Sequence, residues 1–168
     1  MSVFDELLAI KRFREGQAEI AVSRQRLRHA EADAARRGSE AALASFRDEA
    51  ERRERALYGD LCSRVVRVRD IENVLQDVAG LREGERQRQQ ALEAAERQLE
   101  QESEALAARR QQHRQAVRLT GKFVELARIH LDEHLKALEQ KEDLEMEEAA
   151  SISRDREDWE QHEEFEPA

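Results

Sequence analysis

The sequence predicts an all-α fold: a long antiparallel two-helix coiled-coil hairpin whose second helix is longer than its first. Proline, which breaks helices, occurs once among the 168 residues, at Pro167. Charged residues make up 40% of the chain and aromatic residues 4%, so it lacks the large apolar side chains that fill a globular core. Apolar residues recur three and four positions apart, which favours helices over the disorder that high charge would otherwise allow. We therefore expect residues 1–168 to form a single elongated hairpin.

The first helix is expected at about residues 4–58, where a stripe of positions alternates four and three residues apart. Its members are Phe4, Leu8, Lys11, Glu15, Ala18, Val22, Gln25, His29 and Ala32. A more apolar stripe follows through Leu43, Phe46, Ala50 and Leu57. Gly16 and Gly38 each destabilise a helix by about 1 kcal/mol relative to Ala. The middle of this helix should therefore pack least well.

A turn is expected at about residues 59–69, because Gly59 can end the first helix and β-branched valines cluster after it. Asp70 would then be the N-cap of the second helix, expected at about residues 70–163. Its stripe starts at Ile71 and includes Val74, Val78, Leu81, Leu92, Ala95, Leu99, Leu106, Val117, Val124, Ala127, Leu131, Leu135 and Leu138, and its spacing shifts by about one residue between 127 and 135. The polar residues Glu102, Arg109 and His113 interrupt it. Each helix is expected to bury its stripe on the other.

The second helix should extend beyond the start of the first. Pairing back from the turn uses up the first helix near residues 125–130 of the second, and the apolar residues beyond that point have no partner within the chain. The acidic C-terminal tail, residues 139–168, carries 13 acidic and 3 basic side chains, a net charge of −10. An exposed apolar stripe predicts a protein partner, whereas the charge alone would also fit a solvated helix end.

The composition favours the cytoplasm. Cys62 is the single cysteine and can form no internal disulfide, which suits a reducing compartment. The N-terminal sequence MSVFDELLAIKRF lacks the basic start and longer apolar run of a secretory signal. No run of about 18 apolar residues predicts a membrane span.

Three segments, residues 10–19, 70–83 and 122–126, resemble in this order the YscO/FliJ-like (SctO) proteins of type III secretion systems. The stretch from Ile10 to Glu19 resembles their aliphatic-Lys-x-x-Arg-x-x-x-Ala-Glu signature. Residues 70–72 and 81–83 are similar to the segment after the family's turn, and residues 122–126, followed by an acidic run, resemble its C-terminal part. The matching positions include Ile10, Lys11, Arg14, Ala18, Glu19, Lys122, Phe123, Glu125 and Leu126.

This resemblance implies a central stalk of the export apparatus. Such a protein links the hexameric export ATPase to the export gate and handles secretion chaperones. It is cytoplasmic and peripheral to the inner-membrane apparatus, is not inserted in the membrane, and is a monomer in isolation. The resemblance does not separate flagellar from virulence systems.

Residues that a hairpin cannot bury are the candidates for partner binding. At the turn end they are Tyr58, Arg64, Val65, Val66, Arg67, Val68 and Arg69, whose arginines can donate charge-assisted hydrogen bonds. The valines could equally pack on one another to close the turn. At the open end the candidates are Leu131, Leu135, Leu138, Trp159 and Phe165.

The sequence gives no sign of catalysis, a cofactor or a metal. His130 and His134 have the i, i+4 spacing of metal ligands, but the zinc-protease pattern needs Glu directly after the first His, where Leu131 stands. Neither a glycine-rich phosphate loop nor a nucleophile with a positioned base can be found. Acidic residues flank the arginine clusters at residues 24–28 and 52–55, and the net charge is −9, so nucleic acid is not an expected partner.

Two other functions remain compatible with these features. One is a self-associating coiled-coil scaffold, although a dedicated dimer would keep more apolar residues along its stripe. The other is a holdase-type chaperone that grips clients with its exposed apolar stripes.

Overall fold

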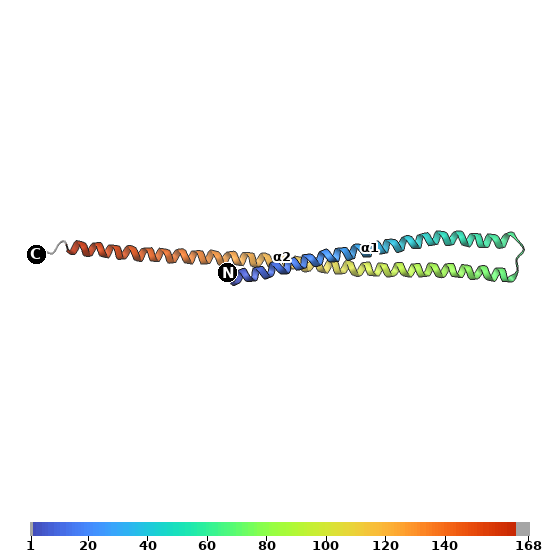
Figure 1. Ribbon diagram of the computed structural model, residues 1–168, viewed down its shortest axis with the longest axis horizontal. Coiled ribbons are helices and arrows are strands. Elements are labelled where there is room, and N and C mark those ends of the chain that lie inside the picture. The colour runs from blue at the N-terminus through green and yellow to red at the C-terminus, as the bar shows by residue number, and fades with distance from the viewer. Residues whose placement is uncertain (1, 164–168) are drawn as a thin grey trace. The chain divides into compact units, whose positions relative to one another are not determined.

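The computed structural model describes residues 2–163, which form two helices, α1 (Val3–Ser63) and α2 (Val68–Glu163), joined by residues 64–67 (Figure 1). No strand occurs among these residues. The all-α hairpin with a longer second helix is thereby confirmed. Neither helix, within residues 2–163, includes a stretch that is long and apolar enough to span a membrane.

The turn is shorter than the sequence predicts. α1 continues through Gly59 to Ser63, so the expected helix end near residue 58 is wrong. Leu61 is half-buried in this last turn, and burying its apolar side chain favours continued helix against the cost of about 1 kcal/mol that a helical glycine carries.

The start of α2 also differs from the prediction, because Asp70 is not the N-cap residue. Its carboxylate accepts a hydrogen bond from the backbone N–H of Arg67 at 2.9 Å, and its own N–H donates to the Arg67 carbonyl at 3.0 Å. An acidic side chain at the third helical position that reaches back to the N-cap residue is half of a capping box. Arg67 is therefore the N-cap, and α2 begins at Val68 instead of residue 70.

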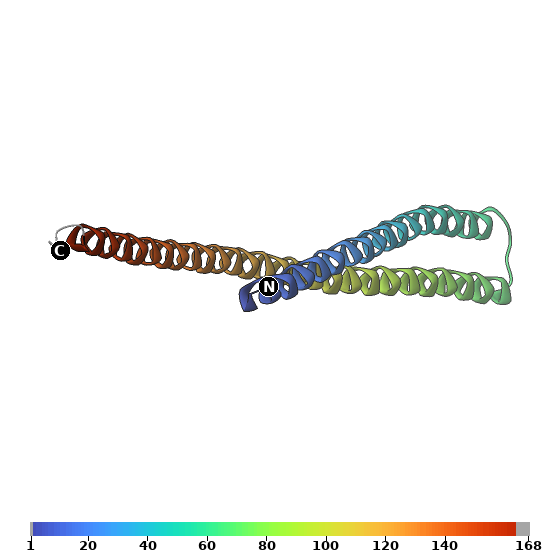
Figure 2. The ribbon, with the colours of Figure 1, turned by 60° about the vertical axis from the view of Figure 1, so that its left-hand side comes forward.

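The chain divides into two compact units. One unit combines the start of α1, as far as Glu15, with α2 from Ala116 onward, and the other is Gly16–Gln115. In the Gly16–Gln115 unit the two helices run antiparallel, and the turn connects them (Figure 2). Its core is a single line of contact, hereafter the seam, whose buried residues are Val22, Gln25, Ala32, Leu43, Val74, Val78 and Leu106.

One contact in this seam depends on the absence of a side chain. The Phe46 ring lies over Gly84, where a Cβ atom would come within 2.7 Å of the ring. The Arg88 guanidinium carbon lies 3.9 Å from the centre of the same ring, a cation–π contact. The glycine therefore makes room for the largest side chain of the seam.

The other unit pairs the start of α1 with the middle of α2. The centres of the Phe4 and His130 rings are 5.0 Å apart, and the Lys11 Nζ lies 5.2 Å from the centre of the Phe123 ring. The predicted overlap, which ends near residues 125–130 of the second helix, agrees with these contacts.

The predicted stripe on the second helix is wrong in this unit. Val117 and Val124 are each 43% exposed, while Thr120 is buried and Phe123 half-buried. Thr120 can be buried because its hydroxyl donates to the Ala116 carbonyl at 2.9 Å and approaches the Lys11 carbonyl at 3.4 Å. The four-and-three alternation of the seam thus continues unshifted from Val74 to Ala127.

Candidate functional site

The turn end exposes apolar side chains. Val65 is fully exposed and Val68 is 73% exposed, so neither valine closes the turn by packing. Ile71 and Leu75 follow Val68 at helical spacing, three and seven residues on, and are 41% and 54% exposed. We call Val65, Val68, Ile71 and Leu75 the turn surface. The sequence predicts Ile71 in the buried stripe of the second helix, which its exposure shows to be wrong, and it does not single out Leu75; the spacing of both from Val68 signals a shared face.

The other predicted residues of the turn end have different roles. Val66 is half-buried, and Tyr58 is 39% exposed. Arg64 pairs with Asp60 at 3.2 Å and with Asp70 at 4.0 Å, so it holds the end of α1 and the start of α2 together.

The remaining arginines of the turn end present their charge to solvent. The side chains of Arg67 and Arg69 are exposed, and neither makes an ion pair with any of residues 2–163. These two side chains are free to meet a carboxylate of a partner.

The open end is more exposed still. Every residue from Arg128 to Glu163 is exposed, and we call residues 131–163 the α2 extension. The predicted contact residues Leu131, Leu135, Leu138 and Trp159 are 55%, 48%, 43% and 74% exposed. Phe165 lies outside the described residues. The extension holds 13 acidic and 4 basic side chains, and Lys141–Glu145 at 4.0 Å is the one ion pair within it.

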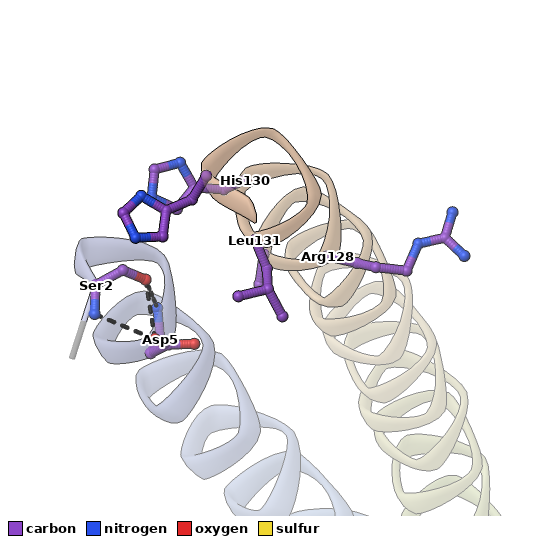
Figure 3. A pocket seen from close by; sticks show the side chains of 7 residues that line it. Ser2, Asp5, Arg128, His130 and Leu131 are labelled. Atoms are coloured by element: carbon purple, nitrogen blue, oxygen red, sulfur yellow. Dashed lines mark hydrogen bonds between the residues drawn. The ribbon is translucent and has the colours of Figure 1, made fainter. Parts of the chain in front are cut away.

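A surface pocket lies at the start of the extension, beside the N-terminus of α1. Its lining includes Ser2, Asp5, His130, Leu131 and His134, and Figure 3 shows Leu131 reaching toward the space between the helices while Arg128 points away. Within the described residues no group of three or more His, Cys, Asp or Glu side chains could hold a metal ion. The pocket lies where the pairing of α2 with α1 ends, because residues of both helices line it and α2 is exposed from Arg128 onward.

A capping box fixes the start of α1 in this pocket. The Ser2 hydroxyl and backbone N–H donate to the Asp5 carboxylate at 2.9 and 3.1 Å, and the Asp5 N–H donates to the Ser2 hydroxyl oxygen at 3.2 Å (Figure 3). These hydrogen bonds stabilise the ionised carboxylate and lower the pKa of Asp5.

The family-like segments identified in the sequence meet in part. Lys11 and Phe123 contact each other, and both are half-buried. Ala18 is half-buried in the seam, and Glu125 pairs with Arg128 at 3.4 Å. The others are exposed: Ile10, Arg14, Glu19, Lys122 and Leu126.

A polar layer interrupts the seam of the Gly16–Gln115 unit. The buried Gln25 amide donates to the Glu102 carbonyl at 3.2 Å and to the Glu102 carboxylate. His29 Nε2 lies 3.1 Å from the Ser103 hydroxyl. Polar groups matched across a helix pair fix its register at some cost in stability.

Known proteins match most of the chain. A family model described as type III secretion protein YscO matches residues 4–152. The crystal structure of the type III secretion protein YscO from Vibrio parahaemolyticus is 30% identical in sequence, with a TM-score of 0.81, and the match covers 86% of this chain and 91% of that one. A search of curated proteins found no match.

Proposed function

The chain belongs to the YscO family of type III secretion proteins, and we propose that it is the central stalk that links a hexameric export ATPase to the export gate. The observation that supports this role most is that both ends expose apolar side chains. Val65 and Val68 do so at the turn, and Leu131 and Leu138 along the α2 extension. Two separate apolar surfaces suit a linker that binds two proteins.

The same proposal places the protein at the cytoplasmic side of the inner-membrane apparatus, as a peripheral component. The polar layer at Gln25 and Glu102 supports pairing within one chain, because a dedicated homodimer would favour an uninterrupted apolar seam. We propose that the isolated protein is a monomer. Exposed apolar side chains outside the two ends, such as Phe13 at 67% and Leu27 at 66%, are available for secretion chaperones.

The test is co-purification with the cognate export ATPase and measurement of its ATP turnover. The wild-type chain should bind the ATPase ring and raise its turnover. The double variant Val65→Asp with Val68→Asp should keep its helicity and bind one partner, the ATPase or the gate protein, at least about tenfold more weakly. Burying a valine side chain contributes about 1.5 kcal/mol or more, and about 1.4 kcal/mol corresponds to a tenfold change.

A matched control adds the same two charges elsewhere at the turn end. Asn73→Asp with Gln76→Glu changes exposed α2 residues outside the turn surface and should leave binding unchanged. If both double variants bind the partner equally weakly, the added charge alone explains the loss of binding. A stable homodimer that ignores the ATPase would instead favour the scaffold, and suppression of client aggregation without ATPase binding would favour the holdase.

A further inference from the structure

α2 carries a second apolar line that its pairing with α1 does not use. Its members are spaced by multiples of seven residues, and we call them the outer stripe: Val117, Val124, Leu131, Leu138, Ile152 and Trp159. Each is between 43% and 74% exposed. The one polar position at this spacing is Glu145. Residues are about 100° apart around an α-helix, so this line lies roughly 60° from Thr120 and Ala127, which face α1.

The spacing of the outer stripe indicates a helical partner. On a straight α-helix a seven-residue repeat drifts by about 20° per heptad, and the drift is taken up when a second helix winds around the first. The outer stripe keeps this repeat for six heptads, over about 63 Å of helix. A flat partner surface would not require such a repeat.

The charges beside the outer stripe indicate that the partner is basic. A carboxylate directly follows four of its six members: Glu125, Asp132, Glu139 and Glu160. The α2 extension has a net charge of −9, with one internal ion pair at 4.0 Å. Two extensions packed side by side would bring like charges together, so pairing of the extension with itself is disfavoured.

We propose that the outer stripe is the docking face for a basic amphipathic helix of a partner protein. This helix presents aliphatic side chains at heptad spacing to the outer stripe and Lys or Arg to the neighbouring carboxylates. The inference rests on the proposed function only for the existence of a partner at the open end, and it adds the chemistry of that partner.

Trp159 makes the test direct, because it belongs to the outer stripe and is the only tryptophan of the chain. The probes are two synthetic helical peptides without tryptophan that share leucines at heptad spacing and carry either Lys or Glu beside them. Titrating the Lys peptide into the full chain should shift Trp159 fluorescence to the blue, with an affinity that falls as salt rises. The Glu peptide should cause no shift.

Two leucine variants separate the outer stripe from the rest of the extension. Leu138→Asp should weaken binding of the Lys peptide at least about tenfold, since a charge replaces a central apolar contact. Leu144→Asp makes the same change about 120° around the helix, at a residue that is 65% exposed, and should alter affinity less than about twofold.

Several results would overturn the proposal: no fluorescence shift, equal response to both peptides, or equal loss in both leucine variants. Sedimentation that shows a dimer in the wild type and a monomer in Leu138→Asp would assign the outer stripe to a second copy instead. ATPase stimulation is measured separately. Stimulation without peptide binding would overturn this inference alone, and peptide binding without stimulation would overturn the stalk role alone.

Discussion

The Gly16–Gln115 unit and the α2 extension are built from the same kind of helix but differ in what covers their apolar residues. In the unit, Leu43 and Leu106 are 4% and 7% exposed because the opposite helix covers them. In the extension, Leu131 and Leu138 have similar periodic spacing and are 55% and 43% exposed. Periodic apolar spacing therefore identifies a helix face that can pack against another helix. Only the structure shows whether that second helix belongs to the same chain.

The largest expected effect is the difference in stability between truncating a buried leucine and truncating an exposed one. Leu43→Ala removes a buried side chain and should lower the free energy of unfolding by about 2–3 kcal/mol, near the lower end for core leucines because a two-helix seam collapses easily. Leu138→Ala should change it by less than about 0.5 kcal/mol. Thermal melts followed by circular dichroism measure both. Equal losses would mean that the extension is covered in solution.

Much of this contrast could be predicted from the sequence. The stripe on the first helix agrees with the structure even at its polar members, since Gln25 is buried and His29 half-buried. The alternation of four and three residues, more than hydrophobicity, identifies the seam. The predicted extension beyond residues 125–130 also agrees, because antiparallel pairing from a short turn fixes where the shorter helix runs out.

The second helix shows where such reasoning fails. Val117 and Val124 are more hydrophobic than Ala116 and Thr120, so they were expected in the seam, yet the smaller pair faces α1. α2 has two apolar lines, and the sequence does not tell which one faces α1. The start of α2 was missed for a local reason, since Asp70 bonds back to Arg67 from within the first turn.

A smaller effect on stability is expected at the polar layer, which the extension lacks. Gln25→Ala leaves the half-buried Glu102 without its cross-helix donor and should cost about 1–2 kcal/mol in urea unfolding. Gln25→Leu combined with Glu102→Leu should match or exceed wild-type stability, because an apolar pair can replace a buried polar one. A double variant less stable than Gln25→Ala would show that the polar layer stabilises the seam outright.

A smaller effect is expected where Phe46 lies over Gly84. Gly84→Ala places a Cβ within 2.7 Å of the ring and should destabilise the protein by about 1 kcal/mol, the net of overpacking and improved helix propensity. Gly80→Ala is the matched control, since nothing lies within 4 Å of its Cβ, and it should stabilise by up to about 1 kcal/mol. Thermal melts of the two variants should therefore shift in opposite directions.

The smallest effect is expected at the start of α1, where paired helix gives way to the extension. Hydrogen bonds from Ser2 hold the pKa of Asp5 below its ordinary value of 3.8, so the folded state favours the ionised carboxylate. The stabilisation is therefore present at neutral pH and is lost as the pH falls below 3.8 through the folded pKa. Nuclear magnetic resonance titration of the Asp5 carboxylate measures this directly. Ser2→Ala should return the pKa toward its ordinary value and speed amide exchange in the first turn, while exchange around Leu43 stays unchanged; an unshifted pKa in the wild type would mean that the capping box does not persist in solution.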